Sequence, residues 1–246
     1  LQEFKSLEGI IGAARSAWEH AVELGTKNGY RNAQATLIAP TGTIGLVMDS
    51  DTTGIEPELA FIKIKKLSGG GNMKFVNNSV GAALRNLGYS GKEVEDITYY
   101  IKGHGKIDGR LREEILEFGF SGDDIEKTNN ALQKSLEFGD KIESPITPQT
   151  FLKKGADRDL VSRILHYVNG EQTIEGAPHL RDEHYAIFDC ANKSGKGKRY
   201  IHANGHIDML GNRGIGPFLS GGASKTVNLP SDATIEDVSE AYMRAW

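Results

Sequence analysis

A short loop that combines two hydroxyl side chains with a glycine is the stretch of this sequence best suited to chemistry. It follows Ala35–Ala39, an apolar run that predicts a buried strand, and it consists of Pro40, Thr41, Gly42, Thr43 and Ile44. If residues 44–48 form a helix, backbone N–H groups of the loop lie at a helix N-terminus, where a phosphate is stabilised. The spacing matches neither a Walker loop nor a dinucleotide fingerprint, so spacing alone favours an ordinary strand-to-helix turn.

Two further loops hold residues that could meet a ligand. Glu56 precedes Pro57 and an alternating segment, Leu59–Leu67, that predicts a half-buried strand. Its carboxylate either meets a ligand, orders the neighbouring loop or, as the pattern favours, forms a local cap or ion pair. Gly69–Gly71 closes the strand and is more typical of a flexible turn than of a phosphate cradle.

The histidines and the single cysteine favour structural roles. His202 and His206 are four residues apart, but Gly205 intervenes and no third His or Cys stands at a zinc-ligand spacing. Cys190 follows Tyr185–Asp189, which predicts another strand, and free cysteines are usually buried. A buried structural thiol is therefore favoured over a reactive one.

A glycine-histidine-glycine turn offers a second possible phosphate contact. Gly103, His104 and Gly105 stand between two expected helices, as in helix-hairpin-helix DNA-binding modules, where backbone amides of the turn contact phosphate. His104 stands where those modules have an apolar residue, and the chain is acidic. A plain connection between helices is the favoured interpretation.

Composition narrows the class of protein. The 246 residues are 38% hydrophobic, enough for a sizeable core, and the net charge of −4 gives no sign of a nucleic-acid partner. No run of about 18 apolar residues predicts a membrane span, and no secretory leader is recognisable. One cysteine allows no internal disulfide. We therefore expect a cytoplasmic protein, and its first and last residues suggest a piece of a longer chain.

Three stretches differ in character. Residues 1–74 combine an amphipathic helix, from Leu7 to about Gly25, with the candidate loops. Residues 75–170 predict a helical insertion whose helices open on caps: Ser90 with Glu93, Ser121 with Asp124, and Thr147 before Pro148. Residues 171–246 return to extended segments, with a helix expected from Gly205, a strand over Ala223–Leu229 and a final capped helix.

Several strings, taken together and in order, resemble the adenosylcobalamin-dependent (class II) ribonucleotide reductases. They span nearly the whole chain and comprise residues 30–49, 51–57, 65–71, 103–105, 175–180, 183–192 and 217–230. The first contains the Pro-Thr-Gly-Thr-Ile loop and the last reads Pro-Phe-Leu-Ser-Gly-Gly-Ala-Ser-Lys-Thr-Val-Asn-Leu-Pro. Members of the family often have a cysteine where Ser50 stands, and no role is assigned to that position.

The resemblance implies a fold and a role for the loop. The fold is α/β, part of a ten-stranded barrel around a finger loop that carries the radical-forming cysteine. In the family, the loop equivalent to Pro40, Thr41, Gly42, Thr43 and Ile44 holds the phosphates of the substrate. Backbone amides bind phosphate without reading the base, which suits an enzyme that accepts four ribonucleotides.

The implied chemistry converts ribonucleotides into 2′-deoxyribonucleotides for DNA synthesis. Adenosylcobalamin generates a cysteine thiyl radical, the 2′-hydroxyl leaves as water, and a cysteine pair re-reduced by a thioredoxin-type protein supplies the electrons. The resemblance further implies a ribonucleotide partner, either diphosphate or triphosphate, and a homodimer for the full-length enzyme, with no membrane and no direct nucleic-acid partner.

Cysteine content limits what this chain can do alone. The implied mechanism needs a thiyl cysteine and a redox pair, whereas the chain has one cysteine. The Asn-Pro-Cys-x-Glu signature of the family is also missing from the sequence, so no catalytic residue is assigned and the chain alone is expected to be inactive. The alternative is a non-catalytic module that binds phosphate or nucleic acid.

Overall fold

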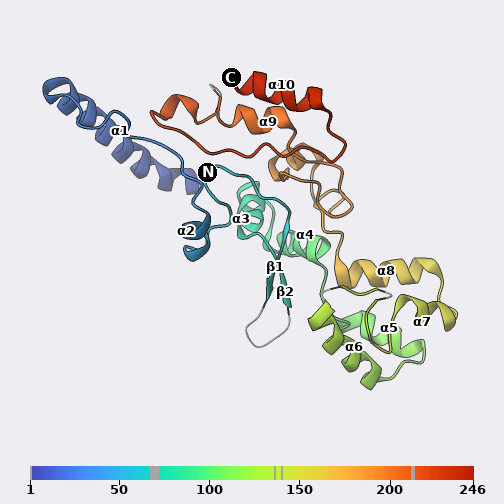
Figure 1. Cartoon of the computed structure of the whole chain (residues 1–246). Helices are drawn as coiled ribbons and strands as arrows, with labels where there is room; N and C mark the ends of the chain where they lie inside the picture. Colours follow the sequence, from blue (N-terminus) through green and yellow to red (C-terminus); the bar gives the residue numbers. More distant parts are fainter. Residues whose placement is uncertain (1, 67–71, 136, 140, 212–213) are drawn as a thin grey trace.

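Helices make up most of the regular structure in the computed structural model, which describes residues 2–66, 72–135, 137–139, 141–211 and 214–246 (Figure 1). The elements, in chain order, are α1 (Gln2–Asn28), α2 (Gly42–Val47), β1 (Ile62–Lys66), β2 (Asn72–Val76), α3 (Asn78–Asn86), α4 (Gly91–Lys102), α5 (Gly109–Glu117), α6 (Gly122–Ser135), α7 (Pro148–Lys153), α8 (Arg158–Asn169), η1 (Asp182–Phe188), α9 (Ala203–Asp208), η2 (Gly216–Phe218) and α10 (Ile235–Ala245). No described helix is both long and apolar enough to cross a membrane.

Local capping signals correctly predict where several helices begin. Ser90 and Glu93 form a reciprocal capping box at α4, and Ser121 and Asp124 exchange the same pair of bonds at α6. Thr147 caps α7, where Pro148 is in the first turn. A capping box of Thr234 with Asp237 starts α10. These bonds satisfy backbone N–H groups that the helix itself leaves unpaired.

Most of the buried apolar side chains belong to two clusters. One is built from the segment that runs from Ile107 through α5, α6, α7 and α8 to Val168, and Phe151 and Ile164 lie at its centre. The other joins α3 and α4 to Phe61 and to residues 174–190. In Figure 1 the first cluster corresponds to the yellow-green group of helices at one end of the molecule.

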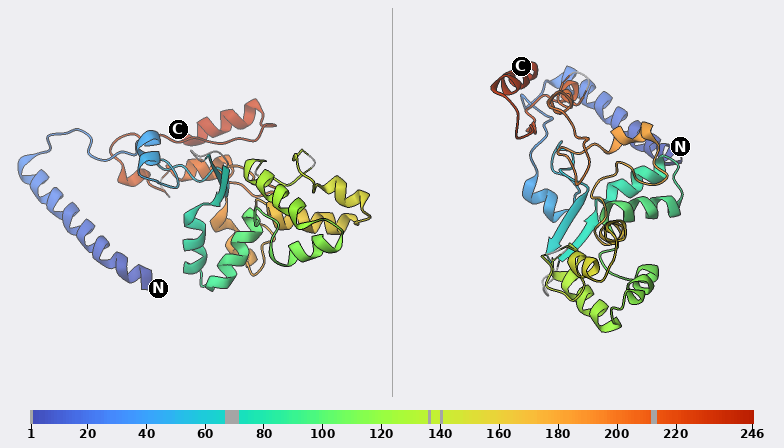
Figure 2. Two further views of the ribbon diagram at one scale, coloured as in Figure 1. Left: turned by 90° about the horizontal axis from the view of Figure 1, so that it is seen from below. Right: turned by 90° about the vertical axis from the view of Figure 1, so that its right-hand side faces the viewer.

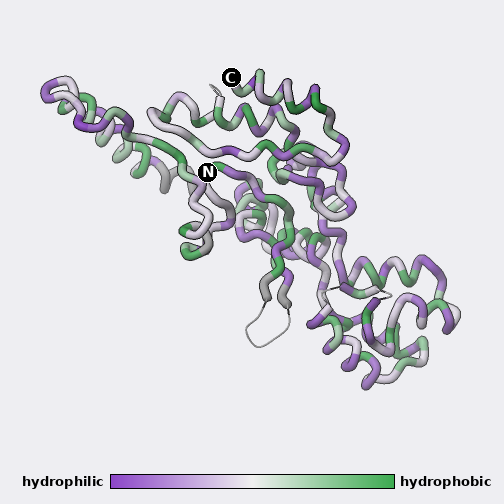
Figure 3. The backbone as a smooth tube through the Cα atoms, viewed as in Figure 1, coloured by the Kyte–Doolittle hydropathy of each residue, from purple (hydrophilic) through white to green (hydrophobic). Residues whose placement is uncertain are grey.

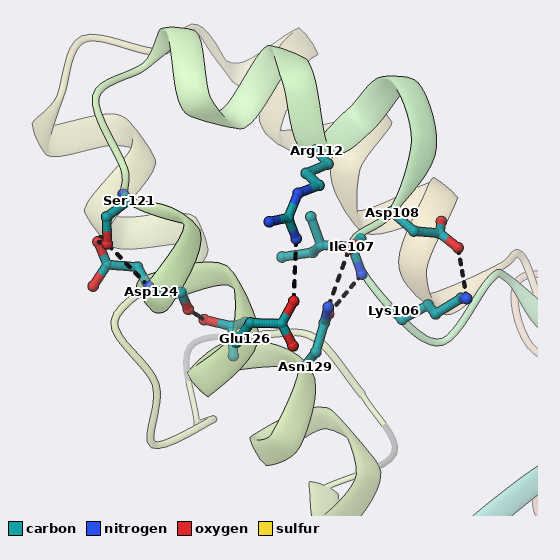
Figure 4. Close-up of polar contacts among 9 residues, drawn as sticks. Lys106, Ile107, Asp108, Arg112, Ser121, Asp124, Glu126 and Asn129 are labelled. Atoms are coloured by element: carbon teal, nitrogen blue, oxygen red, sulfur yellow. Dashed lines mark hydrogen bonds and ion pairs between the residues drawn. The ribbon is translucent and has the colours of Figure 1, made fainter.

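Polar contacts fix α5 against α6 at the edge of the first cluster (Figure 4). The Asn129 side chain accepts from the backbone N–H of Ile107 at 2.7 Å and donates to its carbonyl at 3.1 Å. Arg112 on α5 pairs with Glu126 on α6 at 3.2 Å. The amide group of Asn129 thus replaces a backbone partner for a loop residue that no strand or helix satisfies.

The C-terminal ends of α4 and α8 cross at two glycines. Gly103 and Gly170 both have positive φ with ψ near 180°, a conformation that is essentially restricted to glycine. A Cβ atom on Gly103 would lie 2.3 Å from the Val168 carbonyl oxygen, and one on Gly170 would lie 2.4 Å from the Ile101 carbonyl oxygen. Both positions therefore require glycine.

The predicted strand over Leu59–Leu67 is confirmed in its central part. β1 pairs antiparallel with β2, with Ile62 opposite Val76 and Ile64 opposite Lys74. Ile62 packs on the second cluster, but Ile64 is 59% exposed because the hairpin projects beyond the core (Figure 1). Gly69–Gly71, the predicted closing turn, lies outside the described residues.

Three strand predictions, Tyr185–Asp189, Ala35–Ala39 and Ala223–Leu229, are wrong in whole or in part. Tyr185–Asp189 lies largely in η1, a 3-10 helix, and its buried residues His184 and Phe188 are four apart, a helical spacing rather than the alternation of a strand. Ala35–Ala39 is extended as expected, but Leu37 is 61% exposed, so the segment is not buried. Along one edge its backbone forms hydrogen bonds with a segment from the C-terminal region.

Segments from the two ends of the chain pair in parallel. Ile38 forms an isolated parallel bridge with Ala223. The Ile38 N–H donates to the Gly222 carbonyl, and the Ser224 N–H donates to the Ile38 carbonyl. The Gly221 N–H donates to Thr36 at 2.7 Å. Of the predicted strand Ala223–Leu229, only Ala223 takes part in a bridge. This pairing places the segment before the candidate loop beside the C-terminal region.

Apolar side chains are exposed on α1, α2 and α10. Trp18 on α1 is 57% exposed, Val47 on α2 is 78% exposed and Tyr242 on α10 is 76% exposed. Figure 2 shows α1 lying apart from the helices α5 to α8, and Figure 3 shows apolar residues interleaved with polar ones along it. Within the described residues the sheet has two strands, so the ten-stranded barrel remains an expectation rather than an observation.

Candidate phosphate loop and its supporting ion pair

The candidate loop turns sharply into α2. Thr41 has φ of 48°, an uncommon value for a residue other than glycine, and Gly42 is the first residue of the helix. The Gly45 N–H donates to the Thr41 carbonyl at 2.7 Å. The three preceding amides, of Gly42, Thr43 and Ile44, belong to the first turn, whose N–H groups have no partner within a helix. All residues from Pro40 to Ile44 are exposed.

A second loop, residues 51–57, holds Thr41 in place. The Gly54 N–H donates to Thr41 Oγ1 at 2.7 Å. Gly54 has φ of +55°, and a Cβ atom there would lie 2.8 Å from the Ala39 carbonyl oxygen. The two loops are therefore in backbone contact, which only glycine at position 54 permits.

Glu56 anchors the second loop to the C-terminal region. Its carboxylate accepts from Lys225 Nζ at 2.7 Å and from the Thr226 N–H at 2.6 Å. Burial alone would raise the pKa of Glu56, but these hydrogen bonds and the Lys225 charge outweigh it and lower the pKa. The carboxylate is thus held in its charged form.

The Lys225 ammonium is buried and fully paired. Its side chain is 2% exposed, and it donates to Glu56, to His206 Nδ1 at 2.9 Å and to the Thr226 carbonyl at 2.6 Å. These three acceptors match the three N–H donors of an ammonium group. Burial lowers the pKa of His206, and the adjacent Lys225 charge lowers it further, so the imidazole accepts in its neutral form.

The partners of Glu56 could not be inferred from local sequence. A local cap or ion pair was favoured, whereas the observed partner stands 169 residues away. Neither Lys225 nor His206 was expected to contact Glu56. No local pattern in the sequence links Glu56 to either residue.

The histidine pair does not form a metal site. The His206 ring contacts Lys225, whereas the His202 ring lies 4.3 Å from that of Tyr200, centroid to centroid. No group of three or more His, Cys, Asp or Glu side chains in the described part of the chain could hold a metal ion.

The amides of the glycine-histidine-glycine turn are used inside the molecule. The His104 N–H donates to the Tyr167 carbonyl at 2.8 Å, and the Gly105 N–H donates to the Val168 carbonyl at 2.9 Å. The His104 ring is stacked between Tyr99 and Tyr167, with centroid separations of 4.2 and 3.9 Å. The turn is a connection between helices, as favoured, and those two amides are not free to meet DNA phosphate.

Cys190 is a buried thiol. It is 5% exposed, and its Sγ lies 3.7 Å from the Phe188 carbonyl oxygen. Burial, together with the nearby Glu58 and Asp189 carboxylates, raises its pKa to about 12. These observations match the structural role expected for this residue.

Cys190 should resist alkylation in the folded chain. With a pKa of about 12, the thiolate fraction at pH 8 is on the order of 10³-fold below that of an unfolded cysteine. We expect iodoacetamide to label the native chain at least that much more slowly than the urea-unfolded chain. A Ser50→Cys variant supplies an exposed thiol in the same molecule as a control. Equal labelling of both thiols would contradict a structural Cys190.

A family model matches nearly the whole amino-acid sequence of this chain. The model described as "Ribonucleotide reductase, barrel domain" matches residues 2–118 and 127–246. The chain belongs to the ribonucleotide reductase family, and the model that it matches is that of the family's barrel domain.

Curated relatives indicate which class of ribonucleotide reductase this chain is most similar to. Proteins named vitamin B12-dependent ribonucleotide reductase from Bradyrhizobium diazoefficiens, Agrobacterium fabrum and Rhodopirellula baltica are 44%, 43% and 38% identical over 96%, 97% and 95% of this chain. The chain spans 21%, 20% and 16% of the lengths of these relatives.

Proposed function

We propose that this chain is part of a vitamin B12-dependent ribonucleotide reductase, an enzyme that converts ribonucleotides into 2′-deoxyribonucleotides for DNA synthesis. The observation that carries the proposal is the 44% identity with such an enzyme over 96% of the chain. Adenosylcobalamin as cofactor, a thioredoxin-type reductant and a homodimeric state belong to the same proposal for the whole protein.

Within that enzyme we propose that residues 40–44 bind the phosphates of the substrate. The first-turn residues of α2 are exposed, and the Thr41 and Thr43 hydroxyls lie on the same short loop. Two or three N–H donors aimed at one anion stabilise it strongly because each bond is charge-assisted. Anchoring the phosphates contributes about equally to binding of the substrate and of the transition state, so loss of these contacts is expected to raise KM rather than to lower kcat.

The hollow on the helices α4, α5 and α8 does not fit adenosylcobalamin. The chain has a surface hollow of about 1420 Å³, large enough for such a group, on the helices α4, α5 and α8. Its lining includes two arginines, Arg110 and Arg163, but seven carboxylates, Glu95, Asp96, Glu113, Glu114, Glu117, Asp159 and Glu171, so its net negative charge disfavours the phosphodiester that cobalamin carries. We therefore do not assign cofactor binding to this hollow, and no step of the proposed function runs through the cofactor.

The whole protein that contains this chain provides the test. We expect it to reduce a ribonucleotide in the presence of adenosylcobalamin and a dithiol, with no turnover when the cofactor is left out. Parallel assays with diphosphate and triphosphate substrates identify which is used. The chain of 246 residues, with its one buried cysteine, serves as a control that should give no product. A whole protein that binds ribonucleotides without reducing them would contradict the proposal.

A further inference from the structure

The ion pair of Glu56 and Lys225 is unusually buried, and it joins two segments that are far apart in the sequence. The Lys225 side chain is 2% exposed and the Glu56 side chain is 24% exposed, so the pair is largely removed from water. Charges in such a place are expensive to desolvate and are kept where every polar atom has a partner. Here Lys225 uses all three of its donors, while Glu56 also accepts from the Thr226 N–H.

The pair lies at one end of a continuous chain of contacts that ends at the candidate phosphate loop. Lys225 holds Glu56, which belongs to the same short loop as Gly54. The Gly54 N–H then donates to the hydroxyl of Thr41. A further hydrogen bond within that loop, from the Glu56 N–H to the Thr53 carbonyl at 3.0 Å, ties Glu56 to the turn that contains Gly54.

Thr41 needs outside support for its conformation. Its φ of 48° is a left-handed value that disfavours any residue with a Cβ atom. Two contacts of Gly54 supply this support: its N–H donates to the Thr41 hydroxyl, and its backbone packs closely on the Ala39 carbonyl. Without them, Thr41 would relax toward an ordinary backbone conformation and the first-turn amides of α2 would turn away from their common direction.

We infer that Glu56 and Lys225 are positioning residues whose buried ion pair holds residues 51–57 against Thr41, and thereby keeps residues 40–44 in the conformation that receives the phosphates of the substrate. The inference rests on the proposed phosphate role of that loop. Neither side chain touches the substrate; both act through the Gly54–Thr41 hydrogen bond.

The test uses the whole protein with Lys225→Met, which keeps the length of the side chain and removes its charge. We expect the KM for the ribonucleotide to rise about 10-fold or more, because displaced donors bind poorly, while kcat changes less than about twofold. The inhibition constant of pyrophosphate, a probe of the loop alone, should rise by the same factor. Lys196→Met, which breaks an exposed 2.8 Å pair with Glu171 on another part of the surface, is the control for loss of a lysine charge and should change neither constant.

A second readout is independent of turnover. Hydrogen exchange in the substrate-free whole protein should become faster in peptides covering residues 40–57 of Lys225→Met, while peptides from α5 to α8 keep the native rate. Glu56→Gln, which keeps the acceptor for Thr226, should show a smaller change of the same kind. It also serves if Lys225→Met does not fold. Because the two residues act as one unit, the double variant should be no worse than Lys225→Met.

The outcomes separate this inference from the proposal on which it rests. If Thr43→Pro raises KM while Lys225→Met and Glu56→Gln leave KM and exchange unchanged, the loop binds phosphate without the ion pair, and the inference is wrong. A fall in kcat at constant KM would equally overturn it, since the pair would then act on the chemical step. If none of the three variants changes KM, the phosphate role itself fails and the inference falls with it.

Discussion

Replacing Thr43 with proline should raise the KM for the ribonucleotide about 10- to 100-fold in the whole enzyme. Thr43 is the second residue of α2, a first-turn position where proline is tolerated because its N–H has no helical partner. The substitution therefore removes one N–H donor while the helix is retained. A charge-assisted hydrogen bond to phosphate is worth about 1.5–3 kcal/mol, which corresponds to this change in affinity.

Two control variants separate the amide from other effects of the substitution. Thr43→Ala keeps the N–H and removes only the hydroxyl, so its KM should stay much closer to that of the native enzyme. Glu236→Pro places the same change at the second residue of another helix, α10, and should leave KM unaltered. Steady-state kinetics over a range of substrate concentrations measure all three. An unchanged KM in Thr43→Pro would remove the phosphate role of this loop.

Alanine at Gly103 or at Gly170 should destabilise the crossing of α4 and α8 by at least about 3 kcal/mol. Each Cβ atom would lie within 2.5 Å of backbone atoms of the other segment, and each backbone conformation is one that alanine avoids. The crossing also carries four hydrogen bonds, which join His104 to Tyr167, Gly105 to Val168, Glu171 to Tyr100 and Gln172 to Ile101. Moving either backbone weakens all four together.

Gly88 provides the matched control for this prediction. It has φ of +92°, yet a Cβ atom there would meet nothing within 4 Å. Gly88→Ala should therefore cost only the conformational strain, about 1 kcal/mol. The stability of the three variants is compared by the midpoint urea concentration at which a protease cuts within residues 91–172. Equal midpoints for Gly88→Ala and Gly103→Ala would show that strain alone, and not the backbone contact, makes Gly103 necessary.

Features fixed by neighbouring residues could be predicted from the sequence. The caps at Ser90, Ser121 and Thr147 each depend on a side chain reaching a backbone N–H three residues away. The same holds for the start of the final helix at Thr234. Cys190 was expected to be buried because of its type and its apolar neighbours, and it is.

Features that depend on distant partners could not be predicted. Tyr185–Asp189 was too short an apolar run to distinguish a strand from a helical turn, and it became η1, in which the His184 ring contacts the Tyr89 hydroxyl. The ion pair of Glu56 with Lys225 links residues 169 apart, and no local pattern contains that information. The candidate loop was found from its residue types, whereas the contacts that support it required the structure.

The parallel pairing of the segment before the candidate loop with the C-terminal region has a consequence for how the protein is made. Ala35 and Ser220, which are bonded to each other, are 185 residues apart, and closing so long a loop is entropically unfavourable until nearby segments have folded. At typical rates of synthesis, about 10 to 40 s pass between the emergence of the two partners from the ribosome. The helices between them, whose contacts are mostly local, fold during that interval. The candidate loop is thus among the first parts of this chain to be synthesised and among the last to reach its folded conformation.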